Sequence, residues 1–269
     1  MKLNKTIFAA ALVALAFQSH GQVLLSGGTY SMNFDFPNLE QSTNPNTNWV
    51  NNSDILGWYA ETSFGVVTNY RVSSGGVNNG SVYSFGTTGS SERALGAIPS
   101  GTYNGVTYGV RMQNNTTDTI DSFTVGYTGE QWRNGGPTPA IANTLAFSYR
   151  SSGLAITSPD WANANTWTAV TALDFISPIS STTAAALDGN LAANRIVIGA
   201  TISGLSLTPG QEIFFRWYDI NDVSNDHGLA VDDLTVSYTV VPVPEPTTAA
   251  LMGLGLLLVS NRFRSSRKA

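Results

Sequence analysis

The residues that could do chemistry gather in three short stretches, residues 130–133, 214–222 and 225–234. Glu130 and Asp219 each fall at the end of an expected strand. Two carboxylates that flank a sugar linkage suffice for glycoside hydrolysis, so these two residues are the candidates for that reaction. Acidic residues are otherwise sparse, and no motif fixes two of them at a defined separation. We therefore expect a non-catalytic protein and keep glycoside hydrolase as the lesser alternative.

Histidine and cysteine chemistry is tightly restricted. His227 is the only histidine beyond the first 21 residues, and the chain has no cysteine. These counts exclude disulfides, thiolate catalysis and cysteine-based or multi-histidine metal sites. Asp226 could orient His227 as a base, but no Gly-x-Ser-x-Gly nucleophile elbow accompanies the pair.

Aromatic side chains offer a different kind of site, because their faces stack on sugar rings. The chain has six tryptophans and ten tyrosines. Trp58, Trp132 and Trp161 fall in or near expected loops and are the candidate sugar-binding residues. The alternative is that these rings fill the core, while arginines such as Arg133 and Arg216 pack on tryptophan faces and pair with carboxylates.

The elements that position these groups are predicted to be strands. Apolar and polar residues alternate in short runs, and stretches rich in Gly, Asn and Ser separate the runs. The alternating runs are residues 30–36, 106–112, 123–127, 145–149, 167–175, 196–202, 215–217 and 234–240. About ten strands in one domain favour an all-β fold, a single two-sheet jelly-roll sandwich over residues 22–241. We expect its first strand, residues 30–36, to pair with its last, residues 230–240.

The N-terminal segment, residues 1–21, has the features of a secretory signal peptide. Lys2 and Lys5 precede an apolar run over residues 7–17, and small residues follow. Signal peptidase is expected to cut between Gly21 and Gln22.

The charge of the exported body argues against one class of partner. The whole chain has 13 Lys+Arg and 18 Asp+Glu. Residues 22–241 keep seven arginines against seventeen acidic residues, a net charge of about −10. Such a body repels phosphate backbones, so we expect no binding to nucleic acid.

The C-terminal segment, residues 242–269, has three parts in a fixed order. The two prolines at positions 244 and 246 make a stiff, extended spacer. An apolar helix is expected over about residues 247–260, short for a bilayer core of roughly 30 Å, and the positive end should stay cytoplasmic. The spacer motif is Val243, Pro244, Glu245 and Pro246, and the basic end is Arg262, Arg264, Arg267 and Lys268.

This order of motif, helix and basic end resembles the PEP-CTERM sorting signal of Gram-negative bacteria. The resemblance implies recognition by an exosortase, a membrane cysteine protease, and removal of the tail. Before processing, the helix would hold the protein in the membrane. An ordinary single-span anchor is the alternative.

The body carries a resemblance of its own. Residues 130–133, 186–190, 215–219 and 226–233 look like a β-sandwich module of other exported proteins with PEP-CTERM tails. That resemblance implies a fold and a location but no activity.

The segment 230–234 also resembles the last strand of carbohydrate-binding jelly rolls, in which an aspartate of such a pair helps to hold a structural calcium. Calcium takes six to eight oxygen ligands, and the spacing here is not that of an EF-hand. The alternative is that one aspartate caps backbone amides at a bulge. The candidate calcium ligands are Asp219, Asn221, Asp222, Asp226, Asp232 and Asp233.

Together these features predict an exported, non-catalytic protein of the cell surface or of the extracellular polysaccharide matrix of a biofilm. A carbohydrate-binding module is the first alternative. No cofactor is required by the sequence, and structural calcium is the one candidate.

Overall fold

The computed structural model describes residues 21–35, 47–160 and 166–242. These residues form two packed β-sheets and contain no α-helix. The short 3-10 turns include η3 (Thr171–Leu173) and η4 (Ala192–Asn194). Within the same residues, no helical segment has the length and apolar character that a bilayer crossing requires. The predicted all-β, two-sheet jelly-roll sandwich is confirmed.

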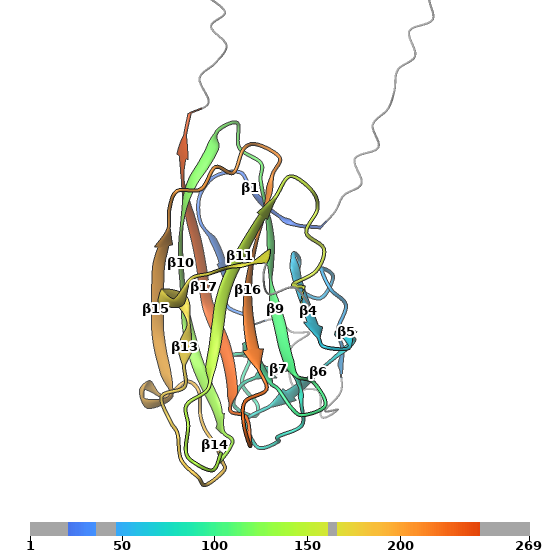
Figure 1. The fold of residues 1–269 in the computed structure, drawn as a ribbon, viewed down its shortest axis with the longest axis vertical. Coiled ribbons are helices and arrows are strands. Elements are labelled where there is room, and N and C mark those ends of the chain that lie inside the picture. Colours follow the sequence, from blue (N-terminus) through green and yellow to red (C-terminus); the bar gives the residue numbers. More distant parts are fainter. Residues whose placement is uncertain (1–20, 36–46, 161–165, 243–269) are drawn as a thin grey trace, which may run out of the picture.

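The first sheet is built around the long strands β9 and β16 (Figure 1). In spatial order its strands are β12 (Thr168–Ala169), β11 (Thr144–Ser152), β16 (Glu212–Ile220), β9 (Gly105–Asn114), β4 (Trp58–Thr62) and β5 (Gly65–Val66), with β1 (Val23–Leu25) beside β9 and β13 (Phe175–Ile176) beside β11.

The second sheet is built around β10 and β17, which pair antiparallel over most of their lengths. In spatial order its strands are β14 (Ala185–Ala186), β10 (Thr119–Asn134), β17 (Gly228–Val241), β8 (Ala94–Ile98), β7 (Ser81–Phe85), β6 (Asn69–Ser73) and β3 (Thr47–Asn48), with β15 (Arg195–Ile202) beside β10 and β2 (Tyr30–Met32) beside β17.

The expected pairing of residues 30–36 with residues 230–240 is confirmed over β2, because Tyr30 lies opposite Val236 and Met32 opposite Leu234. Residues 30–36 are not the first strand, however, since β1 precedes them and pairs with β9 in the other sheet. The single strand expected over residues 167–175 is not formed. There β12 and β13 are two-residue strands, and the turn η3 separates them.

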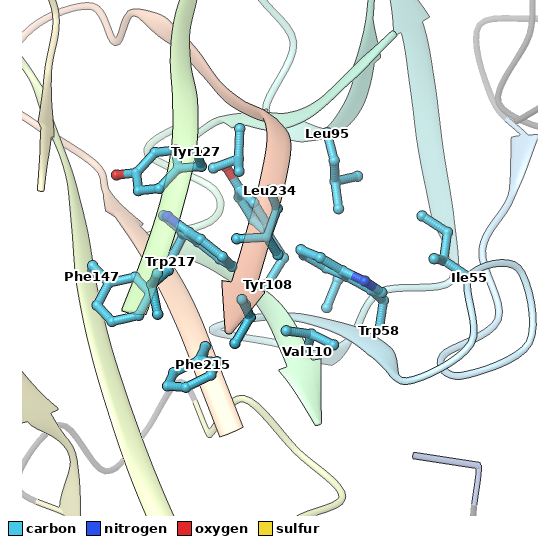
Figure 2. Close-up of a cluster of buried hydrophobic side chains, with 14 of the residues drawn as sticks. Ile55, Trp58, Leu95, Tyr108, Val110, Tyr127, Phe147, Phe215, Trp217 and Leu234 are labelled. Atoms are coloured by element: carbon cyan, nitrogen blue, oxygen red, sulfur yellow. The ribbon is translucent and has the colours of Figure 1, made fainter. Parts of the chain in front are cut away.

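Aromatic rings fill the space between the sheets (Figure 2). The Trp217 ring stacks on Trp58 with centroids 5.8 Å apart, and Tyr127 and Phe147 meet it edge-on at 5.5 and 5.3 Å. Each fully buried apolar side chain of this size stabilises the fold by about 1.5–3 kcal/mol. The alternation that predicted the strand over residues 106–112 reflects this core, since its apolar members are fully buried.

Candidate functional site

A β-bulge in β17 decides which side chains reach the outer face of the second sheet. Leu234 and Val236 point between the sheets, and so do Leu229 and Val231. Alternation along a strand cannot place both pairs on one face unless one residue is inserted. The inserted residue is Asp233, at φ 49° in the register shift opposite Tyr127.

Because of this shift, Asp232 leaves the core side and lies on the outer face. Thr128 of β10 is its direct partner, and Glu130 is its diagonal neighbour on the same face. Diagonal pairs across a sheet are within reach of long side chains. Glu92, just before β8, brings a third carboxyl group to the same place, so one oxygen from each of the three lies within 4.8 Å of the others.

Glu130, Asp232 and Glu92 form what we call the outer acidic cluster. Glu130 is 1% exposed and Asp232 is 5% exposed, while Glu92 is half-buried. Among the residues that the structure describes, this is the one group of acidic or histidine side chains close enough to share a metal ion.

Two neighbours orient the cluster. The indole Nε1 of Trp132 donates to Glu130 Oε2 at 2.9 Å, and the amide Nδ2 of Asn190 donates to Glu92 Oε2. A side chain at position 189 would collide with the Trp132 indole, so Gly189 lets the loop before Asn190 lie directly on that ring. The Leu187 amide then donates to the Trp132 carbonyl at 2.8 Å and anchors the loop.

Two oxygens of the cluster have no hydrogen-bond partner. These are Glu130 Oε1 and Asp232 Oδ1, and both are buried. Burial raises the pKa of Glu130 to about 7. The Trp132 hydrogen bond lowers it in part, and Glu92 raises it further. Burial, then the charge of Glu130, raises the pKa of Asp232 to about 9.

The remaining predicted calcium ligands do not join this cluster. Asp219 is buried in the first sheet, and Asp222 and Asp226 lie in the loop from β16 to β17. Asp233 is exposed. The set predicted from the sequence is therefore divided, and only Asp232 of that set joins the group of facing carboxylates.

The loop group is held by nitrogen donors. The Asp222 amide donates to Asp226 Oδ1 at 2.7 Å, and Asn143 Nδ2 donates to Asp222 Oδ2 at 2.6 Å. The backbone amide of His227 donates to Asn143 Oδ1 at 2.7 Å. Burial raises the pKa of Asp226 to about 6.

The ring of His227 is engaged at both nitrogens. Nδ1 accepts from the Gly135 amide at 2.9 Å, and Nε2 lies 3.0 Å from the Ile141 carbonyl, to which it must donate. Burial lowers the pKa of His227. The ring therefore bonds two backbone groups of the β10–β11 loop rather than facing a nucleophile.

The two carboxylates considered for glycoside hydrolysis are not brought together. Glu130 lies on the outer face of the second sheet, whereas Asp219 pairs with Leu145 and Val106 inside the first sheet. They do not flank a common cleft in this arrangement.

Two of the three tryptophans considered for sugar stacking are less exposed than that role requires. Trp58 and Trp132 are buried, at 0% and 1% exposed, so neither presents a ring face to a sugar. Trp161 lies outside the described residues, as do residues 1–20 of the signal segment and residues 243–269 of the tail.

A groove that the sequence did not point to has an exposed aromatic edge. It encloses about 360 Å³ between the end of β4 and β6 and β7. Phe64, 75% exposed, meets Tyr103 edge-on at a centroid distance of 5.9 Å. Thr68, Asn69 and Arg71 supply polar groups along the same groove. No motif marks Phe64, which lies in a turn.

Comparisons with known proteins bear on the tail and on the fold. Residues 242–268 match the family model of the PEP-CTERM protein-sorting motif. No curated protein matches the chain.

Several solved carbohydrate-binding domains are similar to this chain at a low level. The CBM22-2 xylan-binding domain of Xyn10C from Paenibacillus barcinonensis has a TM-score of 0.35 and 14% identity, covering 70% of this chain and 97% of that one. The CBM22-1 domain of the same protein has a TM-score of 0.35 and 10% identity, covering 80% and 97%. The N-terminal cellulose-binding domain of β-1,4-glucanase C from Cellulomonas fimi has a TM-score of 0.29 and 14% identity, covering 69% and 90%. The chain thus carries a PEP-CTERM sorting motif over residues 242–268, directly C-terminal to an all-β sandwich.

Proposed function

We propose that this chain is an exported, non-catalytic sandwich protein that its C-terminal tail directs to the cell surface or the extracellular matrix of a Gram-negative bacterium. The observation that carries the proposal is the sorting motif over residues 242–268. It begins directly after β17, which ends at Val241. Removal of the tail would therefore cut no strand of the sandwich.

Two processing partners follow from this proposal. Signal peptidase removes residues 1–21 during export, and the apolar run over residues 247–260 then holds the chain in the inner membrane. An exosortase-type protease acts at the motif Val243–Pro246 and releases the folded body toward the polysaccharide outside the cell.

The absence of catalysis is part of the same proposal. Both ring nitrogens of His227 are bonded to backbone groups, and Glu130 and Asp219 do not share a cleft. A histidine base must reach its substrate directly or through one water molecule. These contacts support a structural role for all three residues.

Intact-mass measurement of the protein from its host tests the sorting proposal. The expected mass lacks the signal segment and the tail, and it retains the tail in a host without the exosortase. The double variant Pro244→Ala, Pro246→Ala should also retain the tail, whereas Pro209→Ala, in an exposed turn, should be processed normally. A tail retained in the wild-type host would favour the plain membrane anchor.

A second function, carbohydrate binding, is favoured by the groove beside Phe64. An exposed ring next to Asn, Thr and Arg side chains suits a neutral polysaccharide, which needs a stacking face and hydrogen-bond partners. Affinity electrophoresis in xylan, β-glucan and the host's own exopolysaccharide would detect binding. Phe64→Ala should abolish any retardation, whereas Leu154→Ala, equally exposed but outside the groove, should not. No retardation of the native protein in any of the three gels would reject this function.

A further inference from the structure

We propose that Glu92, Glu130 and Asp232 form a binding site for a divalent cation, with calcium as the preferred ion. The proposal is independent of sorting and of sugar binding, because it rests only on the outer face of the second sheet.

Geometry is the first support. The three carboxyl groups come from different parts of the chain, and one oxygen of each lies within 4.8 Å of the others. Calcium binds carboxylate oxygens at about 2.3–2.6 Å in a flexible geometry, whereas magnesium demands near-ideal octahedral geometry at about 2.0–2.1 Å and keeps several of its waters. Three carboxyl groups from separate parts of the chain therefore suit calcium better than magnesium.

Unpartnered oxygens are the second, independent support. Glu130 Oε1 and Asp232 Oδ1 are buried and accept no hydrogen bond, although both side chains are more than nine-tenths buried. A buried carboxylate oxygen without a partner is costly. A cation between the two oxygens would remove that cost.

The neighbouring positive charges do not supply this partner. Arg93, next to Glu92, directs its guanidinium to the hydroxyl and the carbonyl of Ser84. The ion pairs found in the described residues are Arg111–Glu212 and Arg150–Asp160, and neither touches the cluster. Arg195 lowers the pKa of Glu130 but is itself exposed.

The surroundings also preorient the ligands. Trp132 holds one oxygen of Glu130, so the other oxygen is directed away from the indole. Asn190 holds Glu92 in the same way and ties the loop over residues 187–194 to the site. Such outer partners orient ligand groups around a metal. A bound ion would therefore fasten this loop to the face of the sheet.

The competing explanation is a shared proton. Asp232 could stay protonated and donate to Glu130, which would also satisfy both oxygens. The two explanations differ in what they predict for added metal, because only the cation site responds to calcium near neutral pH.

Terbium luminescence on the exported protein purified from its host gives a direct test. Trp132 touches Glu130 and is placed to sensitise a terbium ion in the site. We expect saturable luminescence that calcium displaces, and a rise in melting temperature with calcium. Asp232→Asn should weaken binding by at least about 10-fold.

Asp233→Asn is the matched control, because it removes the adjacent exposed charge and asparagine tolerates the same backbone conformation. It should weaken binding much less than Asp232→Asn does, because Asp233 acts on the other two carboxylates only through its charge. Asp232→Asn should also melt no lower than the native protein in chelator, since it removes a buried repulsion. This separates a lost ligand from a lost fold. A native protein whose melting temperature does not respond to millimolar calcium would overturn the proposal in favour of the shared proton. Equal weakening of binding by both variants would also overturn it.

Discussion

The molecule has two groups of neighbouring acidic side chains, and they differ in the hydrogen-bond donors that surround them. In the loop from β16 to β17, Asp222 and Asp226 accept hydrogen bonds from the Asn143 amide and a backbone amide. In the outer acidic cluster, the carboxyl groups of Glu130 and Asp232 lie close together, and each keeps one buried oxygen that accepts no hydrogen bond. Carboxylates held by N–H donors stabilise a loop, whereas carboxylates that face one another require a cation or a proton.

The largest expected effect falls on the loop group. Asn143→Ala removes the donor to Asp222 and the acceptor of the His227 amide, both in a buried setting. We expect a loss of about 3 kcal/mol in the free energy of unfolding. Urea denaturation should give the same loss with calcium and with chelator. A loss that calcium abolishes would mean that the loop, too, binds the ion.

The dependence of stability on pH separates the two groups next. The pKa values of Asp226, Glu130 and Asp232 are raised to about 6, 7 and 9. The folded protein therefore keeps protons that the unfolded chain releases above pH about 4, and stability falls as pH rises through this window. Without calcium we expect a fall of about 2 kcal/mol or more between pH 5 and 9.

Asp226 contributes only to the lower part of that fall, so the part between pH 7 and 9 belongs to other groups. Burial raises the pKa of Asp219 well above its usual value. Urea denaturation of Asp232→Asn and Asp219→Asn at pH 7 and 9 therefore shows how much of the loss in unfolding free energy each residue causes. A native profile that stays flat from pH 7 to 9 in chelator would contradict the buried charges described for the cluster.

A smaller effect is expected from the orienting tryptophan. Trp132→Phe removes the donor to Glu130 but keeps a ring that can stack on Phe85, whose plane lies 3° from that of Trp132. We expect a stability loss of about 1 kcal/mol and calcium affinity lower by about 10-fold, measured by calorimetry. Trp167→Phe is the control, because its indole nitrogen has no hydrogen-bond partner. Equal affinities for the two variants would remove Trp132 from the site.

The smallest effect concerns the half-exposed member of the cluster. Glu92→Gln keeps the shape of the side chain and should change the free energy of unfolding in chelator by less than about 0.5 kcal/mol. Calcium affinity should still fall, by less than for Asp232→Asn, because water can replace a peripheral ligand. Unchanged affinity would leave a two-carboxylate site and would weaken the case for calcium over a proton.

The fold could be predicted because its signals are local. Alternation over residues 106–112 and 123–127 comes from apolar side chains that face the core, and the β2–β17 pairing followed from the strand order. The predicted limits of the sandwich, residues 22–241, and the processing of both ends stay predictions.

The site could be predicted only in part. Glu130 and Asp232 were among the candidate site residues, but nothing in the sequence placed them beside Glu92. Local patterns do not determine the register between strands that are distant in the sequence. One signal was present: apolar residues occupy positions 229 and 231 and then 234 and 236, a change of phase at Asp232–Asp233. Trp58 and Trp132 are buried rather than exposed for a related reason, since closeness to a turn does not fix which way a ring points.

The bulge at Asp233 divides β17 into two halves, and the positions that face the core change from odd to even numbers between them. Beyond it, even-numbered positions are committed to the interior, and before it the odd-numbered positions are. A regular strand made of all the same residues would instead put Asp232 on the side of Leu234 and bury a carboxylate among hydrocarbon. Deleting Asp233 would leave strict alternation with Asp232 still outside, so the length of this strand can change by one residue at the bulge without exchanging its two faces.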